Sequence, residues 1–224
     1  MDEIILDVAP NTFQNDAGYF AKMVSEIKKI DTKKYKIIFK TQMFSPESKA
    51  AEINLPFDKH ILRDCFNACQ EAGYQFTSSV FDYASLRALL DSDIPIPFIK
   101  IACRDNLYPL GGYVPRNIPI YVSAAECRMT GGISKWFIYK RDKILDCVPE
   151  YPATRAGYGI SIYNTNISDH TEGLKLFDEW QSHNDDISRK DILSFEMHYV
   201  LERKASNPDA GPFAKTISEL SLIL

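Results

Sequence analysis

The stretch Lys36-Ile37-Ile38-Phe39-Lys40-Thr41 is short, apolar at its centre and polar at both ends. A nearly continuous apolar run of this length is typical of a strand in a sheet that helices cover on both faces. Residues 17–30 before it and 58–72 after it carry apolar residues three and four positions apart, which is the spacing of a helix with one buried face. We therefore interpret this region as a helix–strand–helix segment of a parallel sheet.

Similar strand-like runs recur along the chain at intervals suited to strand–helix units. Residues 83–90 and 172–181 show further helical spacing, whereas residues 129–141 show no clear helix. Eight alternating units predict an α/β fold, a (β/α)8 TIM barrel in which residues 1–224 form a single domain, with a doubly wound open sheet as the alternative. The eight runs are residues 4–8, 36–41, 74–79, 98–103, 118–123, 144–148, 158–163 and 192–199.

The composition is that of an ordinary globular protein, with 45% hydrophobic and 25% charged residues. No apolar run approaches the roughly 18 residues of a membrane span, and residues 1–8 lead directly into a strand without a secretory signal, so we expect a cytoplasmic protein with no membrane partner. A net charge of −4 argues against nucleic acid as a partner. Five cysteines without a C-x-x-C pair predict reduced thiols, and Cys103 is interpreted as a small buried filler.

Polar and titratable side chains gather at the C-terminal ends of the predicted strands, where a TIM barrel builds its functional face. Residues i and i+2 of a strand share a face, so Lys40 with Gln42, and Glu196 with His198, are each expected to point into one space. The candidate site residues at strand ends are Lys40, Gln42, Ser78, Ser79, Lys100, Cys103, Ser123, His170, Glu196 and His198.

Two histidines follow the two closing strands. His170 and His198 have Asp169 and Glu196 beside them. Neutral imidazoles and carboxylate oxygens could bind a divalent cation that keeps open positions for substrate. The alternative is structural, with His198 bonded to backbone at the barrel end and His170 capping a helix. The residues alone leave both interpretations open.

Two lysines, Lys40 and Lys100, are expected at one barrel mouth, where two cations repel each other unless an anion such as a phosphate lies between them. The hydroxyls of Ser78, Ser79 and Ser123 could donate to the same anion. A strand-end lysine also commonly reaches water or pairs with a surface acid, and strand-end serines commonly bond loop backbone. An anion site and a purely structural role therefore both remain open.

The most specific segment of the chain is Ile167-Ser168-Asp169-His170-Thr171-Glu172-Gly173, which resembles the G-Y-S-D-H-T-x-G motif of the sialic acid synthase family. Phe195-Glu196-Met197-His198-Tyr199 is similar to the E-K-H-F motif of that family. Shorter matches follow in the same order over nearly the whole chain. They are residues 40–42 for K-F-Q, 78–82 for S-T-P-F-D, 100–103 for K-I-x-S, Ser123 for the serine of S-T-G, 147–152 for C-x-x-x-Y-P, and Asp209 for an aspartate after the eighth strand.

The resemblance implies a metal-dependent enzyme of carbohydrate biosynthesis that condenses phosphoenolpyruvate with an N-acyl sugar aldehyde. It implies that His170 and His198 bind a catalytic Mn2+ or Mg2+, and Asp7 or Glu196 is the expected proton-transfer partner. The expected partners are small molecules, phosphoenolpyruvate and a sugar aldehyde, and a homodimer is compatible with the resemblance. The residues expected to bind phosphoenolpyruvate are Lys40, Gln42, Ser79, Lys100, Ser123 and Ser168.

Several positions depart from the family pattern. Residues 7–14 stand where the family has E-I-G-x-N-H-N-G, which keeps an acid at Asp7 and loses the histidine. Cys103 replaces a serine, Pro149 replaces a polar residue that contacts phosphoenolpyruvate, and Met197 replaces the lysine of E-K-H. The chain ends without the family's C-terminal antifreeze-like domain, so recognition of N-acetylmannosamine by that domain is not expected.

Two functions of different classes follow from these features. The first is a synthase that adds phosphoenolpyruvate to an aldehyde, makes a 2-keto acid and releases phosphate. The second is a catalytically degenerate synthase-like barrel that acts as a binding or regulatory subunit, which the altered N-terminal motif favours. The retained lysines and histidines favour the enzyme, and another metal-dependent lyase or aldolase on the same barrel stays open.

Overall fold

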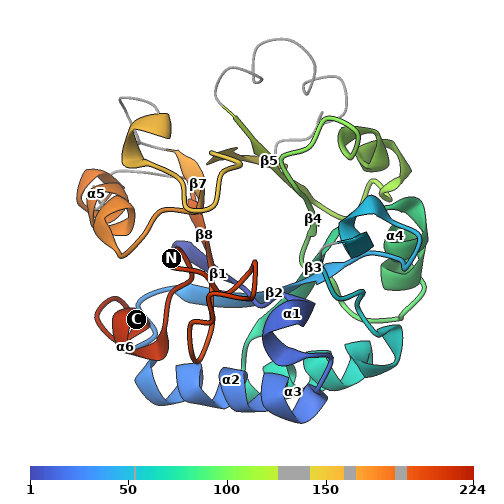
Figure 1. The fold of residues 1–224 in the computed structure, drawn as a ribbon, viewed down its shortest axis with the longest axis horizontal. Helices are drawn as coiled ribbons and strands as arrows, with labels where there is room; N and C mark the ends of the chain where they lie inside the picture. The colour runs from blue at the N-terminus through green and yellow to red at the C-terminus, as the bar shows by residue number, and fades with distance from the viewer. Residues whose placement is uncertain (53, 126–141, 159–164, 185–190) are drawn as a thin grey trace.

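The computed structural model describes all residues except 53, 126–141, 159–164 and 185–190 (Figure 1). Its eight parallel strands close into a barrel in the order β1 to β8. This closure confirms the predicted (β/α)8 barrel and excludes the doubly wound open sheet. The strands are β1 (Glu3–Asp7), β2 (Lys36–Met43), β3 (Gln75–Val80), β4 (Ile99–Ile101), β5 (Ile120–Ala124), β6 (Lys143–Cys147), β7 (Asn166–Asp169) and β8 (Ser194–His198).

Helices pack around the outside of the barrel (Figure 1). The predicted helices at residues 17–30 and 83–90 match α2 and α4, and each begins at an aspartate whose side chain accepts backbone N–H groups of the first turn. The weak stretch 129–141 lies outside the described residues. No helix of the described chain is long and apolar enough to cross a membrane. The α-helices are α1 (Pro10–Phe13), α2 (Ala17–Ile30), α3 (Leu62–Ala72), α4 (Tyr83–Leu90), α5 (Lys175–Asn184) and α6 (Ile217–Leu220), and the 3-10 helices are η1 (Lys49–Glu52), η2 (Lys59–Ile61), η3 (Tyr108–Tyr113) and η5 (Arg155–Gly157).

The seventh strand was predicted in the wrong place. It is β7, Asn166–Asp169, and not residues 158–163, of which 159–163 lie outside the described residues. Tyr158 is buried beside β7 and donates its hydroxyl to the Ser168 carbonyl at 2.8 Å. The run at 158–163 is the more apolar of the two, because β7 has only one large apolar residue, Ile167. The pairing of β7 with β6 and β8 is a tertiary feature that the local sequence does not show.

Side chains fill the N-terminal half of the barrel interior. Ile5, Ile38 and Leu145 pack there with Phe98 and Tyr121, whose stacked rings lie 3.8 Å apart between centroids. Such a filled interior leaves the C-terminal mouth as the end of the barrel that can form a pocket.

Below this layer, the Glu3 carboxylate accepts hydrogen bonds from Lys143, Tyr121 and Ser194. Burial alone would raise the pKa of Glu3, but the charge and hydrogen bond of Lys143 lower it to about 2. An ionised, fully bonded carboxylate therefore closes the N-terminal end of the barrel.

Candidate active site

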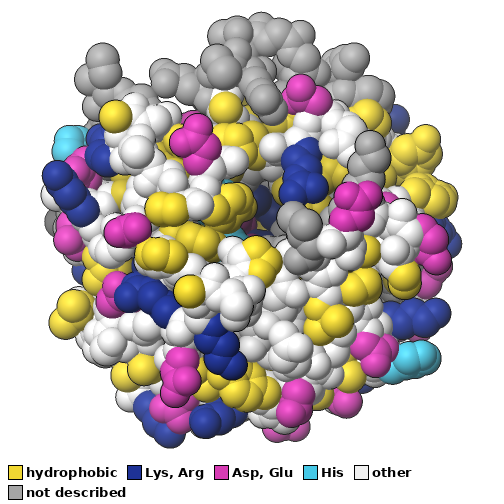
Figure 2. Space-filling view, in the orientation of Figure 1, with side chains coloured by type: hydrophobic (Ala, Val, Ile, Leu, Met, Phe, Trp, Pro, Cys, Tyr) yellow, Lys and Arg dark blue, Asp and Glu magenta, His cyan; other side chains and the backbone are white. Residues whose placement is uncertain are grey.

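A pocket of about 340 Å3 opens at the C-terminal ends of the strands. Its volume is at the lower end of the range for small-molecule sites. Figure 2 shows this face of the molecule, with a hollow near its middle. The lining residues include every residue to which the resemblance assigns a catalytic, metal-binding or phosphoenolpyruvate-binding role, namely Asp7, Lys40, Gln42, Ser79, Lys100, Ser123, Ser168, His170, Glu196 and His198. The fold therefore brings together, in one place, residues from seven of the eight strands or the segments that directly follow them.

One side of the pocket is built around Lys40, whose side chain is only 1% exposed. Its ammonium group donates to Ser79 Oγ at 2.8 Å and pairs with Asp7 Oδ2 at 2.6 Å. Gln42 donates to the same carboxylate oxygen at 3.0 Å. Lys40 is the barrel neighbour of Asp7, so adjacent strands position this pair.

The other side of the pocket is built around Lys100, which is also buried. We call the groups around Lys40 and those around Lys100 the two lysine clusters, or donor clusters. Its ammonium group donates to Ser123 Oγ at 2.7 Å and pairs with Glu196 Oε1 at 3.0 Å, an interaction between β4 and β8 across the barrel mouth. Ser168 donates to the same Glu196 oxygen at 2.9 Å. Burial would raise the pKa of Glu196, but the charges of Lys100 and Lys40 lower it to about 2. Each buried lysine therefore already has a carboxylate partner, which the sequence did not predict.

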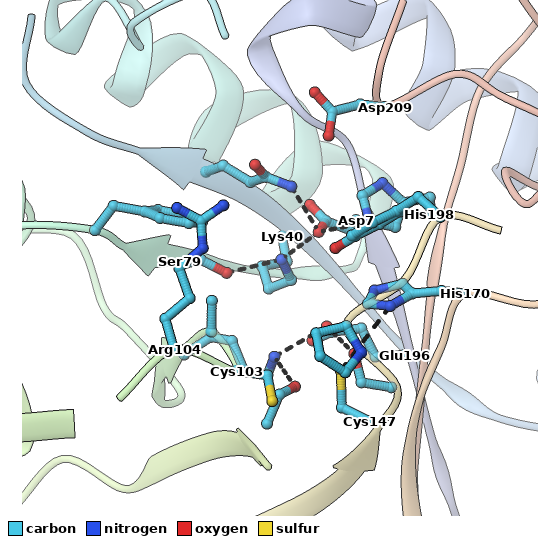
Figure 3. Close-up of a pocket in the computed structure, with 18 of the residues that line it drawn as sticks. Asp7, Lys40, Ser79, Cys103, Arg104, Cys147, His170, Glu196, His198 and Asp209 are labelled. Atoms are coloured by element: carbon cyan, nitrogen blue, oxygen red, sulfur yellow. Dashed lines mark hydrogen bonds and ion pairs between the residues drawn. The ribbon is translucent and has the colours of Figure 1, made fainter. Parts of the chain in front are cut away.

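The two histidines lie on one side of the pocket, as predicted (Figure 3). The ring centroids of His170 and His198 are 5.6 Å apart. His170 Nδ1 lies 2.8 Å from the Val148 carbonyl, which can only accept, so this nitrogen carries the proton and Nε2 keeps its lone pair. His198 Nε2 lies 3.7 Å from Asp7 Oδ2.

The environment keeps His170 neutral. The pKa of its imidazole is lowered from 6.5 to about 3, mainly by burial and next by the neighbouring His198, while the hydrogen bond to the Val148 carbonyl opposes the change. A neutral imidazole with a fixed tautomer is the form of histidine that binds a metal ion.

Acidification from pH 6.5 towards 3 is expected to destabilise the metal-free protein through His170. In this range the unfolded chain binds a proton at His170 that the folded protein does not, so the free energy of unfolding falls as the pH falls. In His170→Gln, the free energy of unfolding is expected to change less with pH over this range. Urea unfolding at several pH values, with a chelator present, measures it. His183→Gln, at an exposed histidine of α5, is the matched control; equal slopes for wild type and His170→Gln would contradict the assignment.

The residues present fit an open metal site with two protein nitrogens. Besides the imidazoles, Asp7 Oδ1 and Glu196 Oε2 are buried and have no hydrogen-bond partner within the described ranges of the chain. In the part of the chain that the structure describes, no three His, Cys, Asp or Glu side chains form a ready metal cluster. A cation held here would therefore take its other ligands from substrate or water.

Some sequence candidates lie outside the pocket or act differently from the prediction. Ser78 does not line the pocket and instead donates to the Thr41 and Ser79 carbonyls. Met197, which replaces the family lysine, is buried in the core between barrel and helices, so this departure leaves the pocket surface unchanged. Cys103 is buried as predicted, but it also lines the pocket.

The cysteine prediction holds for the described thiols. Cys65, Cys69, Cys103 and Cys147 are buried thiols that form no disulfide, and Cys127 lies outside the described residues. His60 and His183 are exposed.

Four residues of the pocket region were missed by the sequence reasoning. Tyr151 and Phe213 lie against the histidines, with the Tyr151 ring 4.2 Å from His170 and the Phe213 ring 5.0 Å from His198 between centroids. Asn54 and Arg104 line the outer part of the pocket. Arg104 follows β4 closely, and Tyr151 is the tyrosine of the C-x-x-x-Y-P match, so a signal was available for both. Nothing local marks Asn54 and Phe213.

The aspartate expected after the eighth strand, Asp209, does reach the pocket. Burial raises its pKa, although His198 and a hydrogen bond from Asn11 oppose the rise. Asn11 Nδ2 donates to Asp209 Oδ2 at 2.7 Å and to Asn54 Oδ1 at 2.8 Å. The altered N-terminal motif therefore still contributes a side chain that organises the pocket rim.

No protein-family model matches the sequence, and no curated protein matches it. The structure is similar to the N-acetylneuraminic acid (sialic acid) synthetase of Leptospira borgpetersenii serovar Hardjo-bovis, with a TM-score of 0.74 and 19% identity over 98% of this chain and 80% of that chain. It is also similar to a spore coat polysaccharide biosynthesis protein E of Chromobacterium violaceum, with a TM-score of 0.76 and 14% identity over 99% of this chain and 72% of that chain.

A more distant similarity is to a truncated 3-deoxy-D-arabino-heptulosonate 7-phosphate synthase of Thermotoga maritima, with a TM-score of 0.62 and 11% identity over 99% of this chain and 83% of that chain. At these identities the similarity establishes the fold. The chain therefore has the barrel fold of sialic acid synthetase, and the resemblance expected from its motifs is confirmed at the level of fold.

Proposed function

We propose that this protein is a metal-dependent synthase that condenses phosphoenolpyruvate with a sugar aldehyde to give a 2-keto acid and phosphate. One observation carries the proposal: two buried lysine–serine pairs, Lys40 with Ser79 and Lys100 with Ser123, share a pocket with two histidines. Buried ammonium and hydroxyl donors suit a small, highly charged anion. The names of the similar structures, a sialic acid synthetase and a heptulosonate-phosphate synthase, support the same class.

The donor arrangement suits the two anionic ends of phosphoenolpyruvate, its phosphate and its carboxylate. An ammonium group has three N–H donors. Lys40 uses two of them on Ser79 and Asp7, and Lys100 uses two on Ser123 and Glu196. Each lysine therefore retains one donor for an incoming anion, and the two clusters can hold the molecule at both ends. Binding at both ends fixes the orientation of phosphoenolpyruvate relative to the aldehyde before the two molecules react.

The carboxylates have a clear role in the empty pocket. A buried lysine without a partner would be costly, and breaking a buried ion pair typically destabilises a protein by about 3–5 kcal/mol. Asp7 and Glu196 neutralise the two lysines before the substrate arrives. The donor pocket is therefore preorganised by ion pairs rather than by repelling cations.

His170 and His198 would hold the divalent cation, Mn2+ or Mg2+, which when bound would polarise the acceptor carbonyl. The lysine clusters orient C3 of phosphoenolpyruvate towards the aldehyde carbon, and a carbon–carbon bond forms between these atoms. Water then adds to C2, the bond from C2 to the phosphate oxygen breaks, and phosphate leaves. One proton of the water passes to the former aldehyde oxygen. The other leaves the C2 hydroxyl as the C2 carbonyl forms, and it departs with the phosphate.

Asp7 is the better candidate for this proton transfer. Glu196, with a pKa of about 2 and bonds from Lys100 and Ser168, is a weak base at neutral pH. Asp7 lies between Lys40 and His198, beside the proposed metal site. Like Glu196, it keeps a buried oxygen without a hydrogen-bond partner among the described residues. We assign Glu196 to the positioning of Lys100 and Ser168.

Incubation with phosphoenolpyruvate, Mn2+ and a panel of aldoses tests the proposal. We expect phosphate release that requires both the aldose and the metal ion, and that a chelator removes. Calorimetric titration with phosphoenolpyruvate measures its binding affinity independently of turnover. No binding in the presence of metal would contradict the proposed function.

The second candidate is a non-catalytic binding subunit. Pro149 and Cys103, which replace polar family residues, both line the pocket, so the donor site has fewer polar groups than the family pattern. Binding of phosphoenolpyruvate without phosphate release from any aldose would favour this candidate over the synthase.

A further inference from the structure

Arg104 is a cation of the pocket that has no acidic partner among the residues that the structure describes. It follows β4, lines the pocket and is exposed, whereas Lys40 and Lys100 are buried and paired with carboxylates. Within the described residues its guanidinium contacts only the Phe81 ring, 5.6 Å from the centroid. An aromatic ring at this distance holds a guanidinium in place without neutralising its charge.

Arg104 differs from the donor clusters in its exposure to solvent. The lysines and serines that suit phosphoenolpyruvate are each at most 2% exposed and form the floor of the pocket. Arg104 reaches into the pocket from its rim (Figure 3). A molecule that enters after phosphoenolpyruvate would therefore meet the guanidinium group, whose planar donors match phosphate and carboxylate oxygens.

The rest of the rim suits a polyhydroxylated molecule. Asp209 and Asn54 line the pocket, and both accept hydrogen bonds from Asn11, which fixes their orientation. A carboxylate and an amide can bind sugar hydroxyls, since they offer acceptors and, for the amide, donors. The rim therefore combines hydroxyl recognition with the guanidinium of Arg104, which no acidic side chain of the described residues pairs with.

We propose that Arg104 binds an anionic substituent of the acceptor, so that the preferred aldehyde is an acidic sugar that carries a phosphate or a carboxylate group. This inference rests on the proposed condensation. The reacting aldehyde carbon would lie at the histidines and the anionic group at Arg104.

Three sugars that differ only at C6 test the inference: mannose, mannose 6-phosphate and mannuronate. In wild-type protein with phosphoenolpyruvate and Mn2+, kcat/KM is expected to be at least tenfold higher for an acidic sugar than for mannose. Arg104→Gln is expected to reduce this preference by roughly 10- to 150-fold, the factor for one charge-assisted hydrogen bond. Arg104→Lys, which keeps the charge, is expected to restore part of it. Comparison of kcat/KM for mannose 6-phosphate and for mannuronate shows whether the protein prefers a phosphate or a carboxylate.

The matched control is Arg116→Gln, which removes an exposed arginine that does not line the pocket and precedes β5 at the opposite end of the barrel. It is expected to keep the wild-type preference. An unchanged preference in Arg104→Gln, or none in the wild type, would overturn the inference. An equal loss of phosphoenolpyruvate affinity in Arg104→Gln would overturn it as well, because Arg104 would then serve the donor.

A binding measurement separates this inference from the proposed function. Mannose 6-phosphate and mannuronate are titrated into wild type and Arg104→Gln without phosphoenolpyruvate. If wild type fails to bind phosphoenolpyruvate, the proposed function fails, and weaker binding of the acidic sugars by Arg104→Gln still supports the anion site. Equal binding by the two proteins would reject the anion site even if phosphoenolpyruvate binds.

Discussion

Replacing His170 or His198 by alanine is expected to lower metal-dependent turnover of phosphoenolpyruvate by about three orders of magnitude while the barrel stays folded. Loss of either imidazole removes one of the two nitrogen ligands proposed for the metal ion. Lewis-acid polarisation of a carbonyl lowers the activation free energy by several kcal/mol. A loss of about 4 kcal/mol of this stabilisation corresponds to a thousandfold decrease in rate. Both side chains line the pocket at its mouth, so the packed interior around Phe98 and Tyr121 is unaffected.

Phosphate release at saturating phosphoenolpyruvate measures this effect, and calorimetric titration with Mn2+ measures metal affinity independently of turnover. His183→Ala, at an exposed histidine far from the pocket lining, is the matched control and should behave as wild type. Wild-type Mn2+ affinity in both pocket variants would show that the histidines do not bind metal, and circular dichroism establishes that each variant is folded.

The second large effect is expected for Lys100→Met, which should weaken phosphoenolpyruvate binding by roughly 10- to 150-fold, the factor for one charge-assisted hydrogen bond of about 1.5–3 kcal/mol. The structure adds a second consequence. Lys100 is the cation beside Glu196, so its loss leaves a buried carboxylate unpaired. The free energy of unfolding is therefore expected to fall by about 3–5 kcal/mol.

The double variant Lys100→Met/Glu196→Gln separates these two effects, because it removes both charges of the pair. It is expected to recover much of the lost stability in urea unfolding and still to bind phosphoenolpyruvate weakly in calorimetric titration. Wild-type affinity in either variant would show that Lys100 does not bind the donor. A double variant as unstable as Lys100→Met would contradict the role assigned to the ion pair.

Local periodicity was sufficient to predict much of the fold and the site. The alternation of side chains along a strand placed Lys40 with Gln42, and Glu196 with His198, on the pocket face before any tertiary information. The same rule left Ser78 and Ser79 undecided, because adjacent residues point to opposite faces and the register of β3 decides which one faces inward. The prediction of the seventh strand was wrong for a related reason. Pairing with β6 and β8 defines β7, and its own apolar content does not.

The sequence by itself therefore determined the barrel, the end of the barrel that carries the chemistry, and most of the polar residues found there, because these depend on short-range backbone geometry. Only the tertiary structure decided which charges meet. Lys100 and Glu196 are 96 residues apart and lie on β4 and β8, and they pair across the mouth because the barrel closes. Likewise, only the tertiary structure shows that the two lysines are paired with carboxylates while Arg104 has no acidic partner in the described part of the chain. Electrostatic partners are set by distance in space and not by position in the chain.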